Sequence, residues 1–419
     1  MIDRDYLKFE HSSVKLVIGN GFDLHCDLHS SFGHYYKFRK ERIERIRNWY
    51  ENFKSEYKKS DFDEFINLND NDDFIKLVNI WDLFFVILAC ERNGEKFDKY
   101  LWSDVEKDIK ESLIYNDSEK PKLEIKKENT RRIFNPILWE EVFVMHHALR
   151  LSNSIPESAL CYIIRKKMGR NCIFDRYAFY GYLLDELKKF EKDFALFLNY
   201  QLVDTSRKSY GITIYNEKYF KKAIQTIKDI CNLDSLVAID TFNYTYIKSD
   251  ELNADINYIN GDINNPIFGI DSIFSPSKTE FTFTKTSRRM TNKNFISENK
   301  NVMSFKYLII YGHSLNEADY SYFFPLFDQM ALSDNTASSK VIFAFSPYGG
   351  HTEAEILENT SDNLFKMFAI YAKEKGLTKR FLDSLTTQHR VLFYKVPPLD
   401  GSLEYHNLFD DRWEEIEKK

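Results

Sequence analysis

Small and polar residues directly follow the first apolar run of this sequence. The run 14–18 ends in Gly19-Asn20-Gly21-Phe22-Asp23. Two glycines around an asparagine allow a tight turn, and backbone N–H groups there can approach a phosphate or a ribose. The same residues also suit a plain structural turn. The segment is not a G-x-G-x-x-G fingerprint, because Leu24 stands where the third glycine belongs.

Two later apolar runs end in asparagine. Asn243 follows the run 235–242, where its amide can orient a water or a ribose hydroxyl, or can cap the next turn. Asn260 and Gly261 stand at the end of the run 256–261. An amide donates and accepts hydrogen bonds, so either side chain could contact a ribose or position a water.

A fourth polar segment begins after the run 306–311. Gly312, His313 and Ser314 come first, and Asp319 closes the segment. His313 can act as an acid or a base near neutral pH, or can be a packed histidine with one hydrogen bond. Ser314 can cap a helix and leave N–H groups facing a cleft.

The apolar runs that carry these residues predict the strands of one sheet. They are nearly continuous, as is typical of strands buried on both faces of a parallel sheet, and helical patterns separate them. We therefore predict an α/β, Rossmann-like fold with a mostly parallel, doubly wound sheet. Ligands bind beyond the carboxyl ends of such strands, so the polar segments should converge on one crevice. The predicted strands are 14–18, 235–242, 256–261, 306–314, 340–347 and 389–397.

A long helical insertion separates the first strand from the others. The stretch 35–230 is rich in Lys, Glu, Leu and Phe, and apolar residues recur at helical spacing. We expect residues 1–34 to hold the first strand and the glycine-rich loop, and residues 231–419 to hold the remainder of the Rossmann-like domain. A helix is predicted from about residue 31, a buried helix near 77–90, and an exposed loop or solvated helix end at 108–132.

Composition narrows the class of protein. The 419 residues include 58 Lys and Arg against 64 Asp and Glu, a net charge of −6, which argues against a strongly basic nucleic-acid surface. The five cysteines form no C-x-x-C pair, so we expect reduced thiols in a cytoplasm and predict no metal. The N-terminus lacks an apolar signal core, and no apolar run is long enough for a comfortable membrane span.

Several motifs together resemble the abortive-infection protein AbiH family of bacterial anti-phage defence. They are IGNGFDLH, LWSDVEKDI, DTFNYT, INYINGD with IFGID, and YGHSLNEADYSYF. That family is in turn similar to the sirtuin-like domains of NAD-degrading defence enzymes. The resemblance implies that Gly19, Asn20, Gly21 and Phe22 form the loop that binds NAD or a related nucleotide. It also implies that Asn243 is the catalytic asparagine and that Gly312 and Ser314 form the ribose-side loop.

One position departs from the sirtuin-like pattern. Asn260 stands where a catalytic histidine is expected, and Asp23 or His313 could take over its role. The predicted catalytic residues are therefore Asp23, Asn243 and His313. Asn260, Gly261 and Asp319 join the predicted nucleotide-binding residues.

Three hypotheses for the function follow. The first is an NAD or related nucleotide hydrolase of the bacterial cytoplasm, with a phage-derived trigger and a homo-oligomeric state as possibilities. The second is a non-catalytic nucleotide-binding sensor or scaffold, which Asn260 favours. The third is an RNA-directed nuclease, which ranks last because no metal-binding carboxylate cluster has a recognisable spacing.

Overall fold

The computed structural model describes thirteen stretches of the chain. They are residues 9–10, 13–57, 72–91, 102–113, 155–168, 176–203, 216–247, 251–252, 254–272, 280–291, 304–347, 352–378 and 380–397.

Six parallel strands form one sheet in the order β3-β2-β1-β4-β5-β6. This is the strand order of the dinucleotide-binding Rossmann fold, so the predicted fold class is confirmed. β1 lies at the centre, where Leu16 is paired with Ile239 on one side and with Ile309 on the other. The strands are β1 (Val14–Ile18), β2 (Leu236–Thr241), β3 (Asp255–Tyr258), β4 (Tyr307–Tyr311), β5 (Lys340–Phe345) and β6 (Val391–Lys395).

Helices cover both faces of the sheet, because alternate residues of each strand point to opposite sides. Leu16 and Ile309 pack in the core cluster that contains α11 (Glu217–Ile230). Val17 and Leu308 pack in a second cluster with the helices that follow β4 and β5. Those helices are α13 (Tyr320–Gln329), α14 (Glu353–Glu374) and α15 (Phe381–Thr387). The sheet is therefore doubly wound.

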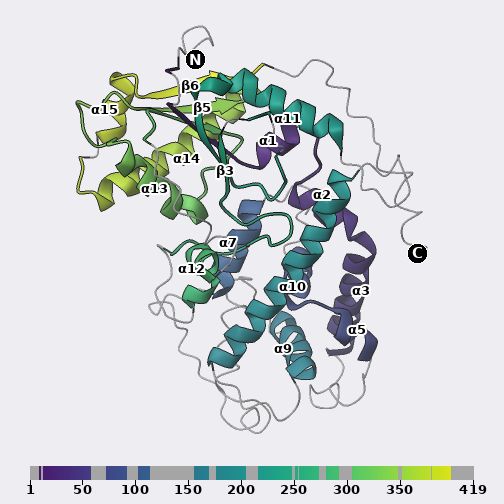
Figure 1. Ribbon diagram of the computed structural model, residues 1–419. Coiled ribbons are helices and arrows are strands. Elements are labelled where there is room, and N and C mark those ends of the chain that lie inside the picture. Colours follow the sequence, from purple (N-terminus) through teal and green to yellow (C-terminus); the bar gives the residue numbers. More distant parts are fainter. Residues whose placement is uncertain are drawn as a thin grey trace.

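A separate helical region lies between β1 and β2 in the chain and has its own hydrophobic core. Figure 1 shows its long helices α3, α9 and α10 at the end of the molecule opposite the strands. The predicted buried helix near 77–90 is present as α6, whose residues 80–89 are all buried. No helix within the described ranges could cross a membrane. The region contains α2 (Phe32–Phe38), α3 (Lys40–Tyr57), α5 (Asp72–Leu77), α6 (Ile80–Glu91), α7 (Trp102–Leu113), α9 (Ile155–Met168) and α10 (Arg176–Leu202).

The helix predicted from about residue 31 is divided in two at Arg39. This residue is the C-cap of α2, with φ −105° and ψ 21°, and its side chain is buried. Its guanidinium donates to both carboxylate oxygens of Asp82 at 2.6 and 2.5 Å. This buried, bidentate ion pair holds Arg39 at the junction of α2 and α3.

Short elements complete the description. The stretch 108–132 was predicted as an exposed loop or a solvated helix end. Residues 108–113 form the end of α7, so the helix end is present, but Ile109 and Leu113 in it are buried. Residues 114–132 lie outside the described ranges. The remaining elements are α1 (Asn20–His25), η5 (Leu233–Ser235), η8 (Glu280–Phe283), α12 (Lys285–Thr291) and η10 (Glu317–Asp319).

Candidate functional site

A cleft of about 560 Å³ opens beyond the carboxyl ends of the strands. The chain leaves β1 toward one face of the sheet and β4 toward the other, so the cleft lies at the topological switch point. Polar segments after β1, β2, β3 and β4 meet there, as expected from the sequence. The predicted residues that line it are Gly19, Asn20, Gly21, Asp23, Asn243, Asn260, Gly312, His313, Ser314 and Asp319, whereas Phe22 and Gly261 do not.

The glycines after β1 contact the backbone after β4. The N–H of Gly21 donates to the carbonyl oxygen of Gly312 at 2.8 Å. A Cβ atom on Gly21 would lie 2.7 Å from the Cα of Gly312, and one on Gly312 would lie 2.5 Å from the nitrogen of Phe22. Gly312 also has φ +65°, a conformation that favours glycine. The close approach predicted for these glycines is therefore made between two parts of the protein, the first turn of α1 and the segment after β4. Residues 20–22, predicted as part of a loop, lie in α1.

Asp23 is a buried carboxylate with hydroxyl partners. The Tyr219 hydroxyl of α11 donates to its Oδ1 at 2.9 Å, and the Thr245 hydroxyl lies 2.8 Å from its Oδ2. Within the described stretches, no Lys, Arg or His nitrogen forms an ion pair with it at 4.0 Å or less. Burial raises the pKa of Asp23 to about 6, although the hydrogen bonds from Thr245 and Tyr219 oppose this. Asp23 can therefore exchange a proton near neutral pH.

Asn243 joins the ends of two neighbouring strands. Its Nδ2 donates to the carbonyl oxygen of Gly19 at 3.0 Å, and its backbone N–H donates to the hydroxyl of Thr241, also at 3.0 Å. Its side chain also lowers the pKa of Asp23 by hydrogen bonding. The amide thus fixes the loop after β1, next to the cleft. On the other side of that loop, the Ser30 hydroxyl donates to Oδ1 of Asn20 at 2.6 Å.

His313 has partners for both ring nitrogens. Its Nδ1 accepts a hydrogen bond from the N–H of Leu315 at 2.9 Å, so the neutral ring carries its hydrogen on Nε2. Nε2 lies 3.4 Å from Oδ2 of Asp319. The ring centroid is 4.3 Å from that of Phe242. Of the two roles considered from the sequence, this arrangement is that of a packed histidine in the cleft wall.

A buried ion cluster adjoins His313, and two of its members were not selected from the sequence. The ammonium group of Lys285 lies 2.8 Å from Glu106 of α7 and 2.7 Å from Asp319. Burial raises the pKa of Glu106 to about 7 against the opposing effect of Lys285. Burial also acts to raise the pKa of Asp319, but Lys285 and His313 outweigh it and hold that pKa below its usual value. Glu106 lies within the motif LWSDVEKDI, and this motif is the feature of the sequence that could have indicated it as a site residue.

The remaining predicted residues have structural contacts. Asn260 accepts a hydrogen bond on Oδ1 from Arg289 at 3.0 Å, and its carbonyl accepts from the N–H of Ile267 at 2.7 Å. Gly261 has φ +83° and no room for a Cβ, which would lie 2.1 Å from the carbonyl oxygen of Asn265. Ser314 is exposed at the rim of the cleft.

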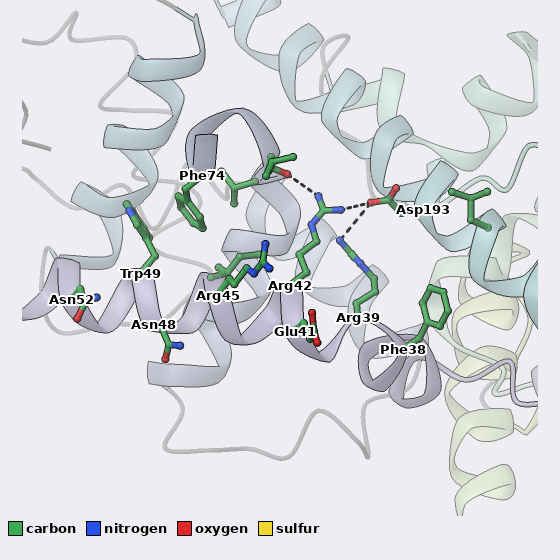
Figure 2. A pocket seen from close by; sticks show the side chains of 14 residues that line it. Phe38, Arg39, Glu41, Arg42, Arg45, Asn48, Trp49, Asn52, Phe74 and Asp193 are labelled. Carbon is green, nitrogen blue, oxygen red and sulfur yellow. Dashed lines mark hydrogen bonds and ion pairs between the residues drawn. The ribbon is translucent and has the colours of Figure 1, made fainter. Parts of the chain in front are cut away.

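A second, larger hollow of about 880 Å³ lies in the helical region beside α3 and α5. Figure 2 shows Arg39 and Arg42 directed toward Asp193, and Trp49 beside Phe74. Arg42 lies 2.8 Å from Asp193, and Trp49 stacks on Phe74 with ring centroids 5.2 Å apart. Its arginines Arg39 and Arg42 are thus engaged within the protein. We therefore place the candidate site in the cleft at the sheet.

Comparisons with known proteins agree with the motifs. The chain matches the family described as "Bacteriophage abortive infection AbiH" over residues 16–340, a range that begins within β1 and includes the helical region and β2 to β4. No curated protein and no solved structure matches the chain.

Proposed function

The chain belongs to the AbiH family of bacteriophage abortive infection proteins, and from this premise we propose that it consumes a nucleotide of the NAD type. The nucleotide binds in the cleft between β1 and β4, and its glycosidic bond is hydrolysed there. The observation that carries this proposal is Asp23, a carboxyl group without a cationic partner among the described residues, whose pKa of about 6 suits proton transfer.

The position and size of the cleft support a nucleotide ligand. A sheet with the order β3-β2-β1-β4-β5-β6 binds dinucleotides at the crevice between its two halves. The volume of about 560 Å³ lies within the range of small-molecule sites. Aromatic and amide side chains such as Phe242, Tyr244 and Asn359 line it and can contact a base and a ribose.

The chemistry assigned to Asp23 is that of a general base. Water attacks the anomeric carbon of the ribose, and the bond from that carbon to the pyridinium nitrogen breaks with its electron pair going to nitrogen. Asp23 accepts the proton of the water and later returns it to solvent. His313 is unsuited to this role here because its Nδ1 already accepts from Leu315. Asn243 holds Gly19, the N-cap of the helix α1 that carries Asp23.

The proposal is tested by measuring nicotinamide release from NAD by mass spectrometry, with and without lysate of infected bacteria. We expect Asp23→Asn to lower the turnover rate by about 100-fold or more, the usual contribution of a general base. Asp27→Asn is the matched control. Asp27 is a partly exposed acid on the next turn that forms an ion pair with Lys222, and it has φ +62°, which Asn tolerates. Equal turnover by wild type and Asp23→Asn, or intact NAD under all triggers, would overturn the proposal.

A nucleotide-binding sensor is the second candidate, and Asn260 favours it. Its amide is engaged by Arg289 at the position where a catalytic histidine is expected. A sensor binds NAD saturably and forms no product, which calorimetry together with mass spectrometry distinguishes from hydrolysis. Gly21→Val should abolish binding in either case, because its side chain would displace Gly312 and open the wall of the cleft. Both candidates place the protein in the bacterial cytoplasm, with a phage-derived trigger.

A further inference from the structure

Two buried carboxylates of the helical region bind the connection between β3 and β4. Glu106 of α7 pairs with Lys285 at 2.8 Å. Glu191 of α10 pairs with Arg288 at 2.7 Å and accepts the backbone N–H of Phe268 at 2.8 Å. Both residues are less than 7% exposed. The two contacts resemble each other in burial and charge. They differ in position, because of the two glutamates only Glu106 lines the cleft.

The contact made by Glu106 continues into the wall of the cleft. Lys285 donates to Asp319 at 2.7 Å, and Asp319 lies 3.4 Å from Nε2 of His313. The loop that carries His313 has two residues in the left-handed region, Gly312 with φ +65° and Leu315 with φ +53°. A non-glycine residue keeps that conformation only when surrounding contacts hold it. Asp319 and the hydrogen bond from Leu315 to His313 are contacts of this kind.

We propose that Glu106 is a positioning residue through which the helical region sets the orientation of His313 and thereby the affinity of the cleft for its nucleotide. Removing the charge of Glu106 weakens the hold of α7 on Lys285. The Lys285–Asp319 pair, whose atoms are already 2.7 Å apart, can then shift as a unit and turn the Asp319 carboxylate away from His313. α7 is also tied to η10 by a second, more exposed ion pair, between Lys110 and Glu317 at 3.3 Å. A displacement of α7 would therefore act on the same loop. The part of this proposal that concerns affinity rests on the proposed function.

The charged surroundings of Glu106 predict a pH dependence. The groups that face it are Lys285 and Arg289 of α12, Asp319 of η10 and Tyr244 after β2. When Glu106 is ionised, the charges of the two carboxylates and the two cations cancel. When Glu106 takes up a proton near pH 7, the cluster has a net charge of about +1. We therefore expect nucleotide affinity to change between pH 6 and pH 8. Asp23 of the same cleft has a pKa of about 6 and contributes mainly below pH 7, so the change between pH 7 and pH 8 should be largely lost when residue 106 is glutamine.

The first experiment needs no ligand. Histidine labelled with ¹³C at Cε1 is incorporated into the full chain, and the signal of His313 is identified from its loss in His313→Gln. We expect Glu106→Gln to shift this signal and Glu191→Gln to leave it in place. An unmoved signal in Glu106→Gln, or equal shifts in both variants, would overturn the proposal. Should Glu106→Gln fail to fold, the same measurement is made on Glu106→Asp. Aspartate keeps the charge, but its side chain is shorter and holds Lys285 less closely, so the His313 signal should again shift.

The second experiment measures the affinity for NAD by calorimetry at pH 6, 7 and 8. We expect Glu106→Gln to weaken binding about tenfold, as for the loss of one charged hydrogen bond, and to remove most of the difference in affinity between pH 7 and pH 8. Glu191→Gln should retain the wild-type affinity and pH profile. If both variants weaken binding equally, Glu106 only clamps two regions together and the proposal is wrong. If the wild type binds no NAD, the proposed function is wrong, and the histidine signal decides whether Glu106 positions His313.

Discussion

Asp23 and Asp319 are two aspartates of the same cleft whose environments differ. Both are buried, and burial by itself raises the pKa of each. Asp23 has the hydroxyls of Tyr219 and Thr245 as partners, and its pKa stays raised. Asp319 has the ammonium group of Lys285, and its pKa is lowered. For these two aspartates, the difference in partner separates a fixed charge from an acid that exchanges protons near neutral pH.

The largest effect that tests this comparison is expected for Lys285→Met. The substitution leaves Glu106 and Asp319 buried without their cation, and breaking a buried ion pair in this way costs about 3–5 kcal/mol. Urea unfolding at pH 8 measures the loss. Asp319 should then resemble Asp23, with a pKa above the usual value, because the opposing charge is gone.

Lys222→Met is the control for this variant. Lys222 pairs with Asp27, which is 43% exposed, so its loss should cost less than about 1 kcal/mol. A similar, small loss for Lys285→Met would mean that Asp319 does not depend on its cation.

A smaller effect of opposite sign is expected for Asp23→Asn. The folded-state pKa of about 6 exceeds the ordinary aspartate pKa of 3.8, so Asp23 favours folding in its protonated form. That contribution is complete below pH 3.8 and is lost as the pH rises through 6. Asparagine does not titrate, so the variant does not lose stability in this way as the pH rises. The hydroxyls of Tyr219 and Thr245 can accept hydrogen bonds from its amide. We expect Asp23→Asn to be more stable than wild type by about 3 kcal/mol at pH 8 and equal to it at pH 3.5.

Unfolding by urea at several pH values checks this result, and Asp27→Asn should show no such gain. If Asp23→Asn is less stable than wild type at pH 8, the carboxylate is stabilised by its partners, and the contrast with Asp319 fails.

The smallest effect is expected for Tyr219→Phe, which removes one of the hydroxyl donors to Asp23. The loss of one hydrogen bond costs about 1 kcal/mol. Because this donor lowers the pKa of Asp23, its removal should move the stability transition of Asp23 above pH 6. Tyr244→Phe is the matched control, since Tyr244 is also buried but donates to the carbonyl oxygen of Ile267. A transition that moves equally in both variants would assign the effect to packing.

The sequence predicted the sheet well because each strand is a local apolar run. The predicted strand 14–18 coincides with β1, and the others differ mainly where a turn follows the strand. The run 256–261 was too long: β3 ends at Tyr258, since Ile259 and Asn260 form a turn before Gly261 at φ +83°.

The contacts of the site were less predictable, because they join distant segments. The cluster of Glu106, Lys285 and Asp319 brings together three elements, and no local pattern indicates that these side chains meet. The partner of Gly21 is Gly312, which sequence spacing alone does not reveal. The polar ends of β1, β2 and β4 were predictable as a group because parallel strands place their carboxyl ends at one edge.

The central place of β1 has a consequence for synthesis on the ribosome. β1 is the first strand to emerge, yet its partners begin at Leu236 and Tyr307. At roughly 5–20 residues per second, the intervening chain of about 300 residues takes on the order of 15–60 s to make. The helices α2 to α10 share a core largely of their own, so they can fold during this delay. An apolar strand that waits so long for its neighbours is exposed to aggregation, and a chaperone holding the N-terminus would be expected to raise the yield of active protein.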